Sequence, residues 1–164
     1  MKIVFLDIDG VLATPKQYST KRNKLWSKDP IAARLGIPYM FDERCVIAFN
    51  RFVLMNDVDI VLSSDWRRHF SLEEIDEIFK INGVAKSPIS YTKILPAVTM
   101  TEDLESIRIR EISDWLKEND PPLWCAIDDM DLSDLGHKFV QTDERMGFGA
   151  TGFGKKLEAM LYPF

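Results

Sequence analysis

The fold of this chain is decided near its start by the stretch Lys2-Ile3-Val4-Phe5-Leu6-Asp7-Ile8-Asp9-Gly10-Val11-Leu12. Residues 3–6 are all apolar, which is typical of a short strand buried on both faces in a parallel sheet. Asp7 and Asp9 then follow two positions apart, and in an extended segment this spacing puts both side chains on the same side. Gly10 allows the chain to turn sharply after them. Because open α/β sheets bind ligands at the carboxyl ends of their strands, we predict a functional site here.

The two aspartates indicate a cation site. Carboxylates held close together repel each other unless a cation joins them or one takes a proton. The pair therefore suggests a Mg²⁺ site in which one carboxylate is a nucleophile and the other transfers a proton. An acidic turn that merely closes a strand is the alternative interpretation. The strand before the pair and the apolar Val11-Leu12 behind it favour the functional one.

The composition is that of an ordinary globular protein, and the length of 164 residues predicts a single domain over residues 1–164. A net charge of −5 excludes a global basic field of the kind that attracts nucleic acid. No secretory signal and no apolar run of transmembrane length is recognisable, so we expect a cytoplasmic protein without membrane contact. Cys45 and Cys125 are expected to be buried free thiols.

Predicted strands alternate with predicted helices along the chain. Helices are expected over about 43–56, 71–82, 101–118 and 154–161, and strands over 58–64, 123–127 and 138–142. Residues 84–100 are expected to be a loop that contains a short extended piece around Ile89. This alternation predicts a three-layer α/β/α sandwich with a mainly parallel, Rossmann-like sheet.

Two predicted helices have apolar stripes that should face the sheet. The stripe of the helix near 43–56 consists of Val46, Phe49, Val53 and Leu54, widened by Ile47 and Phe52. The stripe of the helix that begins near residue 101 consists of Leu104, Ile107, Ile112, Trp115 and Leu116. Thr101 is the expected N-cap of that second helix.

Two further groups of polar residues follow predicted strands. Ser63 and Ser64 end the strand over 58–64, and a hydroxyl at that position can donate a hydrogen bond to a phosphate oxygen. Asp128 and Asp129 follow the strand over 123–127 and could complete an oxygen-ligand shell for Mg²⁺. Serines commonly close strands, and paired aspartates can form a plain turn. The presence of the first acidic pair at an equivalent strand end favours a common site.

These groups, with a basic residue between them, resemble the motifs of the haloacid dehalogenase (HAD) superfamily of phosphohydrolases in their proper order. The segments Ser63-Ser64-Asp65-Trp66-Arg67, 108–116 and 139–143 also resemble a small, nearly capless HAD subgroup. That subgroup includes the HAD domains attached to RNA-repair proteins. The resemblance spans nearly the whole chain, and the first and last acidic motifs are its most specific parts.

The resemblance implies a Mg²⁺-dependent phosphatase that works through an aspartyl-phosphate. It assigns Asp7 as the nucleophile and Asp9 as the general acid/base, with the main-chain carbonyl of Asp9 in the metal shell. Ser63 matches the phosphate-binding hydroxyl. Asp129 matches the direct metal ligand of the last pair, with Asp128 ligating or supporting it.

The resemblance assigns Arg108 as the cation that faces the phosphoryl group. The chain departs from the subgroup pattern at Ile109, where glycine is usual, so Lys86 and Lys93 stay open as alternatives. Arg108 could also be a surface residue that pairs with Glu105 or Glu111.

Ser64 and Arg67 are predicted substrate-binding residues, with Arg67 holding a second phosphate or closing the site. Trp66 is expected in the core, with stacking on a base as the alternative. His69 and His137 lack metal-ligand spacing and are expected to be incidental.

A basic segment follows the first acidic pair. Its positive charges could attract a phosphorylated substrate or could belong to a solvated loop; they are Lys16, Lys21, Arg22 and Lys24. No insertion is long enough for a large cap, and the resulting open site suits a phosphorylated small molecule or a nucleic-acid end. A phosphotransferase with the same residues, or a non-catalytic phosphate-binding module, remains as an alternative function.

Overall fold

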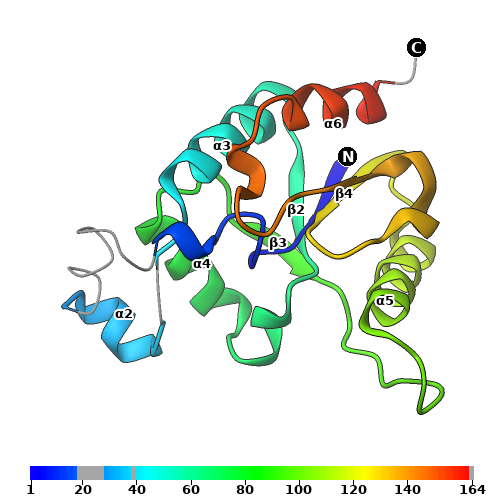
Figure 1. Ribbon diagram of the computed structural model, residues 1–164, viewed down its shortest axis with the longest axis horizontal. Coiled ribbons are helices and arrows are strands. Elements are labelled where there is room, and N and C mark those ends of the chain that lie inside the picture. The colour runs from blue at the N-terminus through cyan, green and yellow to red at the C-terminus, as the bar shows by residue number, and fades with distance from the viewer. Residues whose placement is uncertain (18–27, 38–39, 163–164) are drawn as a thin grey trace.

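The computed structural model describes residues 1–17, 28–37 and 40–162 (Figure 1). Five strands form one parallel sheet in the order β3-β2-β1-β4-β5. The strands are β1 (Lys2–Leu6), β2 (Asp59–Leu62), β3 (Pro88–Tyr91), β4 (Leu123–Asp128) and β5 (Phe139–Gln141). The predicted α/β class with a mainly parallel sheet is confirmed, and β1 lies at the centre of that sheet.

The α-helices are α2 (Pro30–Leu35), α3 (Glu43–Asn56), α4 (Leu72–Ile81), α5 (Leu104–Asn119) and α6 (Phe153–Leu161). Short 3₁₀ helices occur at η1 (Pro15–Gln17), η2 (Asp65–Arg68), η3 (Ser133–Lys138) and η4 (Gly147–Gly149). The predicted capping box of α4 is present, because Ser71 and Glu74 each accept a hydrogen bond from the other's backbone N–H. Among the described residues, no helix has both the length and the apolar character needed to cross a bilayer.

The alternation of β1 explains the three layers. Val4 and Leu6 face a core that α3, α4 and α6 cover. Ile3 and Phe5 face the other side, where α5 packs, and the rings of Phe5 and Trp115 meet edge to face at 5.3 Å. Both faces of β1 are covered, and accordingly its residues 3–6 are apolar and fully buried. Asp7 follows directly and therefore lies at the middle of the sheet's carboxyl edge.

Two predicted helix features are wrong. α5 begins at Leu104, and its N-cap is Asp103, whose carboxylate accepts the backbone N–H of Ser106 at 2.8 Å; Thr101 lies outside the helix. Leu104 is 65% exposed and therefore does not belong to the buried stripe. In α3, Ile47 and Leu54 are 64% and 58% exposed, because they are rotated away from the face that Val46, Phe49 and Val53 turn to the sheet.

The extended piece expected around Ile89 is a complete edge strand of the sheet. β3 pairs with β2, with Val61 opposite Ser90 and Leu62 opposite Tyr91. Pro88 begins the strand, which fits an edge position because proline has no N–H to donate to a neighbour.

The predicted buried free thiols are confirmed. Burial raises the pKa of Cys45 to about 11, so this thiol stays protonated at neutral pH. Burial likewise raises the pKa of Cys125.

Candidate active site

Three of the four predicted acidic residues bring their carboxylates together at the carboxyl edge of the sheet, and the exposed carboxylate of Asp9 is not among them. β1 and β4 are neighbours, with Leu6 opposite Ile127, so the residues that follow these two positions converge. One carboxylate oxygen from each of Asp7, Asp128 and Asp129 lies within 4.8 Å of the other two. The fold thus places carboxylates from two separate strand ends close enough to share one cation.

Gly10 leaves room for the carboxylate of Asp129. Its φ of +71° is in the left-handed region, and a Cβ atom built on it would lie 2.3 Å from Oδ2 of Asp129. The loop after β1 is fixed in this position, since its Gly10 carbonyl accepts a hydrogen bond of 2.8 Å from Thr142 Oγ1. A side chain at Gly10 would therefore displace the Asp129 carboxylate.

The electrostatics of the cluster suit a bound cation. Burial raises the pKa of Asp7 to about 6, although Arg108 and a hydrogen bond from the Ser64 hydroxyl both act to lower it. Burial, with the nearby charge of Asp7, raises the pKa of Asp128 well above its ordinary value, and burial also raises that of Asp129. Hard oxygen ligands at close range, which ionise reluctantly on their own, fit a divalent cation such as Mg²⁺.

Arg108 lies beside this cluster. The helix α5 brings its buried guanidinium within 2.8 Å of Oδ2 of Asp128 and 3.6 Å of Oδ1 of Asp7. The two alternative cations lie elsewhere. Lys86 pairs with Asp57 at 2.7 Å, just before the start of β2, and Lys93 forms an exposed pair with Glu118. Of the three candidates, the structure places only Arg108 where it can face a phosphoryl group bound at the acids.

The serine pair after β2 lies next to the acids. The backbone N–H of Ser63 donates to the carbonyl of Leu6 at 2.9 Å, which ties the end of β2 to the end of β1. Ser63 and Ser64 are both buried, and the hydroxyl of Ser64 bonds to Asp7. Ser64 also caps η2, since its Oγ accepts the backbone N–H of Trp66.

Arg67 does not have the position that we predicted for a substrate-binding residue. Its side chain is completely covered, and its guanidinium donates to the carbonyls of Ser63, Ser64 and Thr92 at 2.7, 2.6 and 3.0 Å. It also forms an ion pair with buried Glu111. Arg67 therefore supports the serine segment from behind. The ion pair of Glu111 with Arg67 was not predicted. Glu111 was expected only as an alternative partner of a surface-exposed Arg108; Arg108 is buried instead, and its Nε lies 3.8 Å from Oε2 of Glu111.

Asp9 is exposed, and Trp66 determines its orientation. The indole Nε1 of Trp66 donates to Oδ2 of Asp9 at 2.9 Å. The Trp66 ring is buried and packs against Phe41 and Phe70, so its expected place in the core is confirmed. A cavity of about 470 Å³ opens at this point, with Asp9 and Trp66 in its lining.

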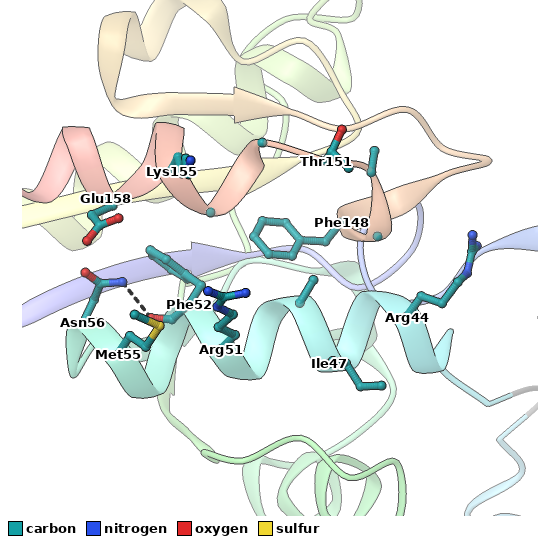
Figure 2. Close-up of a pocket in the computed structure, with 15 residues that line it drawn as sticks. Arg44, Ile47, Arg51, Phe52, Met55, Asn56, Phe148, Thr151, Lys155 and Glu158 are labelled. Carbon is teal, nitrogen blue, oxygen red and sulfur yellow. Dashed lines mark hydrogen bonds between the residues drawn. The ribbon is translucent and has the colours of Figure 1, made fainter.

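A larger cavity of about 720 Å³ lies between α3 and the segment formed by η4 and α6 (Figure 2). Its lining combines apolar side chains such as Phe52 and Met55 with basic ones such as Arg51 and Lys155. None of the predicted catalytic or metal-binding residues lines it. Of the basic segment, Lys16 contacts the sulfur of Met146, while Lys21, Arg22 and Lys24 lie outside the described residues.

A parallel sheet with converging acids and a buried arginine at its carboxyl edge defines a HAD-type protein. The chain belongs to the family described as the HAD domain in Swiss Army Knife RNA repair proteins, whose profile matches residues 3–152. The resemblance read from the sequence motifs is thus confirmed. This family places the chain among phosphoryl-transfer proteins, which generally use Mg²⁺. No curated protein and no solved structure matches the chain.

Proposed function

We propose that this protein is a Mg²⁺-dependent phosphatase that hydrolyses a phosphomonoester through an aspartyl-phosphate on Asp7. The observation that supports this most strongly is the convergence of Asp7, Asp128 and Asp129 within 4.8 Å, beside the guanidinium of Arg108. A purely structural role does not explain three buried or half-buried carboxylates at one point, since their mutual repulsion is costly without a cation.

Mg²⁺ would be held by Asp7, Asp129 and the main-chain carbonyl of Asp9, with Asp128 as a further ligand or as a support. When bound, the ion offsets the repulsion between the carboxylates and the dianionic phosphate. The space over Gly10 suits this arrangement because it brings Asp129 close to the loop that contains Asp9.

In the first step, the Asp7 carboxylate attacks phosphorus, and the bond from phosphorus to the leaving oxygen breaks. Asp9 gives its proton to that oxygen. In the second step, Asp9 takes a proton from a water molecule, which attacks the phosphorus of the aspartyl-phosphate. Inorganic phosphate leaves and the Asp7 carboxylate is restored. Ser63 and Arg108 bind the phosphoryl oxygens as their charge increases.

Three neighbours of these residues have supporting roles. Arg67 fixes the segment of Ser63 and Ser64 through their carbonyls, and Trp66 orients the Asp9 carboxylate. The hydrogen bond from the Ser64 hydroxyl acts to lower the pKa of the Asp7 carboxyl and so favours its nucleophilic, ionised form. The substrate is a phosphorylated small molecule or a nucleic-acid end, since the open edge of the sheet admits either.

The test is phosphate release from p-nitrophenyl phosphate with and without Mg²⁺, for wild type and Asp7→Asn. Asp57→Asn is the matched control, because it makes the same change at an exposed aspartate just before β2. We expect Mg²⁺-dependent turnover that Asp7→Asn abolishes and Asp57→Asn retains. Equal turnover in wild type and Asp7→Asn would show that the nucleophile is wrongly assigned.

A phosphotransferase would use the same residues with an alcohol in place of water. Adding acceptor alcohols to the assay separates the two activities, because a transferase yields a new phosphoester in place of part of the free phosphate. A non-catalytic module would give no turnover with any ester, yet both Asp7 and Asp9, which such a module has no need to keep, are present.

A further inference from the structure

The cavity beside Asp9 has a lining unlike that of the acidic cluster. Its volume is about 470 Å³, which is in the range of small-molecule sites. One part of the wall comes from Leu35 and Gly36 at the end of α2, and another from His69 and Phe70 after η2. Phe70 is half-buried, and its ring lies 5.5 Å from that of Trp66. An aliphatic and aromatic wall of this kind suits a flat ring.

The charges in this cavity are negative. Asp9 and Asp65 are both in its lining, and none of the described residues that line it is Lys or Arg. The cations nearby are already paired, because Arg68 lies 3.2 Å and Arg108 3.4 Å from Oδ1 of Asp65. A second phosphate in this space would therefore meet two carboxylates, with His69 but no Lys or Arg among the described lining residues to offset them.

The position of the cavity beside Asp9 indicates which part of the substrate it would bind. Asp9 gives its proton to the leaving oxygen, so the group attached to that oxygen must lie on the Asp9 side of the phosphate. The cavity is the described space that Asp9 itself lines. In the proposed mechanism, the leaving group and this cavity therefore lie on the same side of the phosphate, the side of Asp9.

We infer that the cavity beside Asp9 binds the leaving group of the substrate, and that this group is an uncharged alcohol bearing an aromatic ring, such as a nucleoside. This inference rests on the proposed phosphatase function. The ring packs against Phe70 and Leu35, while the hydroxyl-bearing part reaches Asp9. A leaving group with a further phosphate is disfavoured, because the lining places the carboxylates of Asp9 and Asp65 there and, among the described residues, has His69 but no Lys or Arg.

Three substrates test the inference by kcat/KM. Adenosine 5′-monophosphate and ribose 5-phosphate have the same phosphoester and differ in the base. Adenosine 3′,5′-bisphosphate leaves a second phosphate on the leaving group whichever ester is cleaved. We expect kcat/KM of the monophosphate to exceed that of ribose 5-phosphate by about tenfold, the factor that corresponds to one aromatic contact. It should also exceed that of the bisphosphate, because the second phosphate of the bisphosphate meets the carboxylates of Asp9 and Asp65.

Phe70→Ala should remove most of the difference in kcat/KM between adenosine 5′-monophosphate and ribose 5-phosphate. Phe70→Leu keeps more of the packing against Trp66 and should remove a similar part of that difference. Met55→Ala is the control, since it shortens an exposed apolar residue in the lining of the other cavity. Met55→Ala should leave this difference in kcat/KM unchanged. Equal kcat/KM for the monophosphate and ribose 5-phosphate in wild type overturns the inference.

Binding separates this inference from the proposed function. Adenosine and ribose, which contain no phosphate, are titrated into wild type, Phe70→Ala and Met55→Ala by calorimetry. Binding of adenosine but not ribose, lost only in Phe70→Ala, supports the cavity assignment even if no ester is hydrolysed. If p-nitrophenyl phosphate is hydrolysed and adenosine does not bind, the phosphatase stands and the leaving-group site is wrong.

Discussion

The indole Nε1 of Trp66 lies 2.9 Å from Oδ2 of Asp9 and donates a hydrogen bond to it. The two residues differ sharply in environment, because Trp66 is 6% exposed while Asp9 lies at the surface. Phe41 meets the Trp66 ring at 5.7 Å and an angle of 70°, so the indole cannot turn away without disturbing the core. A rigid core residue thereby determines the direction of an exposed carboxylate.

The first prediction follows from this contact. Trp66→Phe keeps an aromatic ring in the core and removes the N–H that orients Asp9. We expect kcat to fall about tenfold for an alkyl phosphate such as glycerol phosphate, whose leaving oxygen needs a proton. With p-nitrophenyl phosphate the loss should be much smaller, because p-nitrophenolate is a good leaving group without protonation. Steady-state kinetics on the two substrates measures the difference.

Trp115→Phe is the matched control for that variant. Trp115 is also buried, and its Nε1 donates to Ser90 Oγ at 3.0 Å on the opposite face of the sheet. It should change neither substrate's kcat by more than a small factor. An equal loss on both substrates in Trp66→Phe would mean that Trp66 supports only the packing and does not position Asp9.

The second prediction concerns the space over Gly10. In Gly10→Ala the new Cβ meets the Asp129 carboxylate, and the φ of +71° adds backbone strain. Gly83→Ala is the control, since its φ is +76° and no atom lies within 4 Å of the new Cβ. Both variants should melt at a lower temperature. In thermal unfolding with and without Mg²⁺, wild type and Gly83→Ala should gain stability from the metal, and Gly10→Ala should not.

The third prediction concerns pH. The pKa of Asp7 in the folded protein is about 6, above its ordinary value of 3.8. A carboxyl group whose pKa is raised by folding favours the folded state when protonated, so its contribution is present below about pH 4 and is lost as the pH rises to about 6. In Asp7→Asn this loss is absent. In urea unfolding without metal, the free energy of unfolding of Asp7→Asn should therefore increase relative to that of wild type across this range, by about 1 to 3 kcal/mol.

Above pH 6, Mg²⁺ should make the wild type more stable than Asp7→Asn. The metal binds the ionised carboxylate and stabilises the folded wild type by mass action, whereas Asp7→Asn has lost a ligand. The same linkage predicts that the apparent Mg²⁺ affinity of wild type falls as the pH drops below about 6. A difference between the two proteins that stays constant with pH in metal-free urea unfolding would count against the raised pKa.

The alternation of strands and helices predicted the parallel sheet, and the strand–acid–glycine pattern at residues 3–10 predicted that Asp7 directly follows one of its buried strands. That prediction succeeds because a strand buried on both faces leaves a direct mark in the sequence, and because parallel strands must end at one edge. Asp128 and Asp129 could be assigned to the same edge for this reason. The helix stripes were less exact, since Ile47 and Leu54 are apolar residues that face outward on α3.

Contacts between distant segments could not be predicted from local spacing. Trp66 and Asp9 are 57 residues apart, and nothing near either residue signals a bond between them. Arg67 was misassigned for the same reason, because its partner Glu111 lies 44 residues further along the chain. A basic residue next to a phosphate-binding serine looks like a substrate contact until the fold shows that it points into the interior.

The last prediction tests this structural role of Arg67. Both members of the Arg67–Glu111 pair are covered, with side-chain exposures of 0% and 2%. Arg67→Met leaves the Glu111 carboxylate buried without its partner and should destabilise the protein by about 3 to 5 kcal/mol in urea unfolding. Arg34→Met, which breaks an exposed pair with Glu77, should cost less than about 1 kcal/mol. The double variant Arg67→Met/Glu111→Leu should recover part of the loss, since no buried charge of the pair remains, while the carbonyls of Ser63, Ser64 and Thr92 still lack the Arg67 donor. If Arg67→Met instead unfolds like Arg34→Met while its KM rises, Arg67 contacts substrate after all.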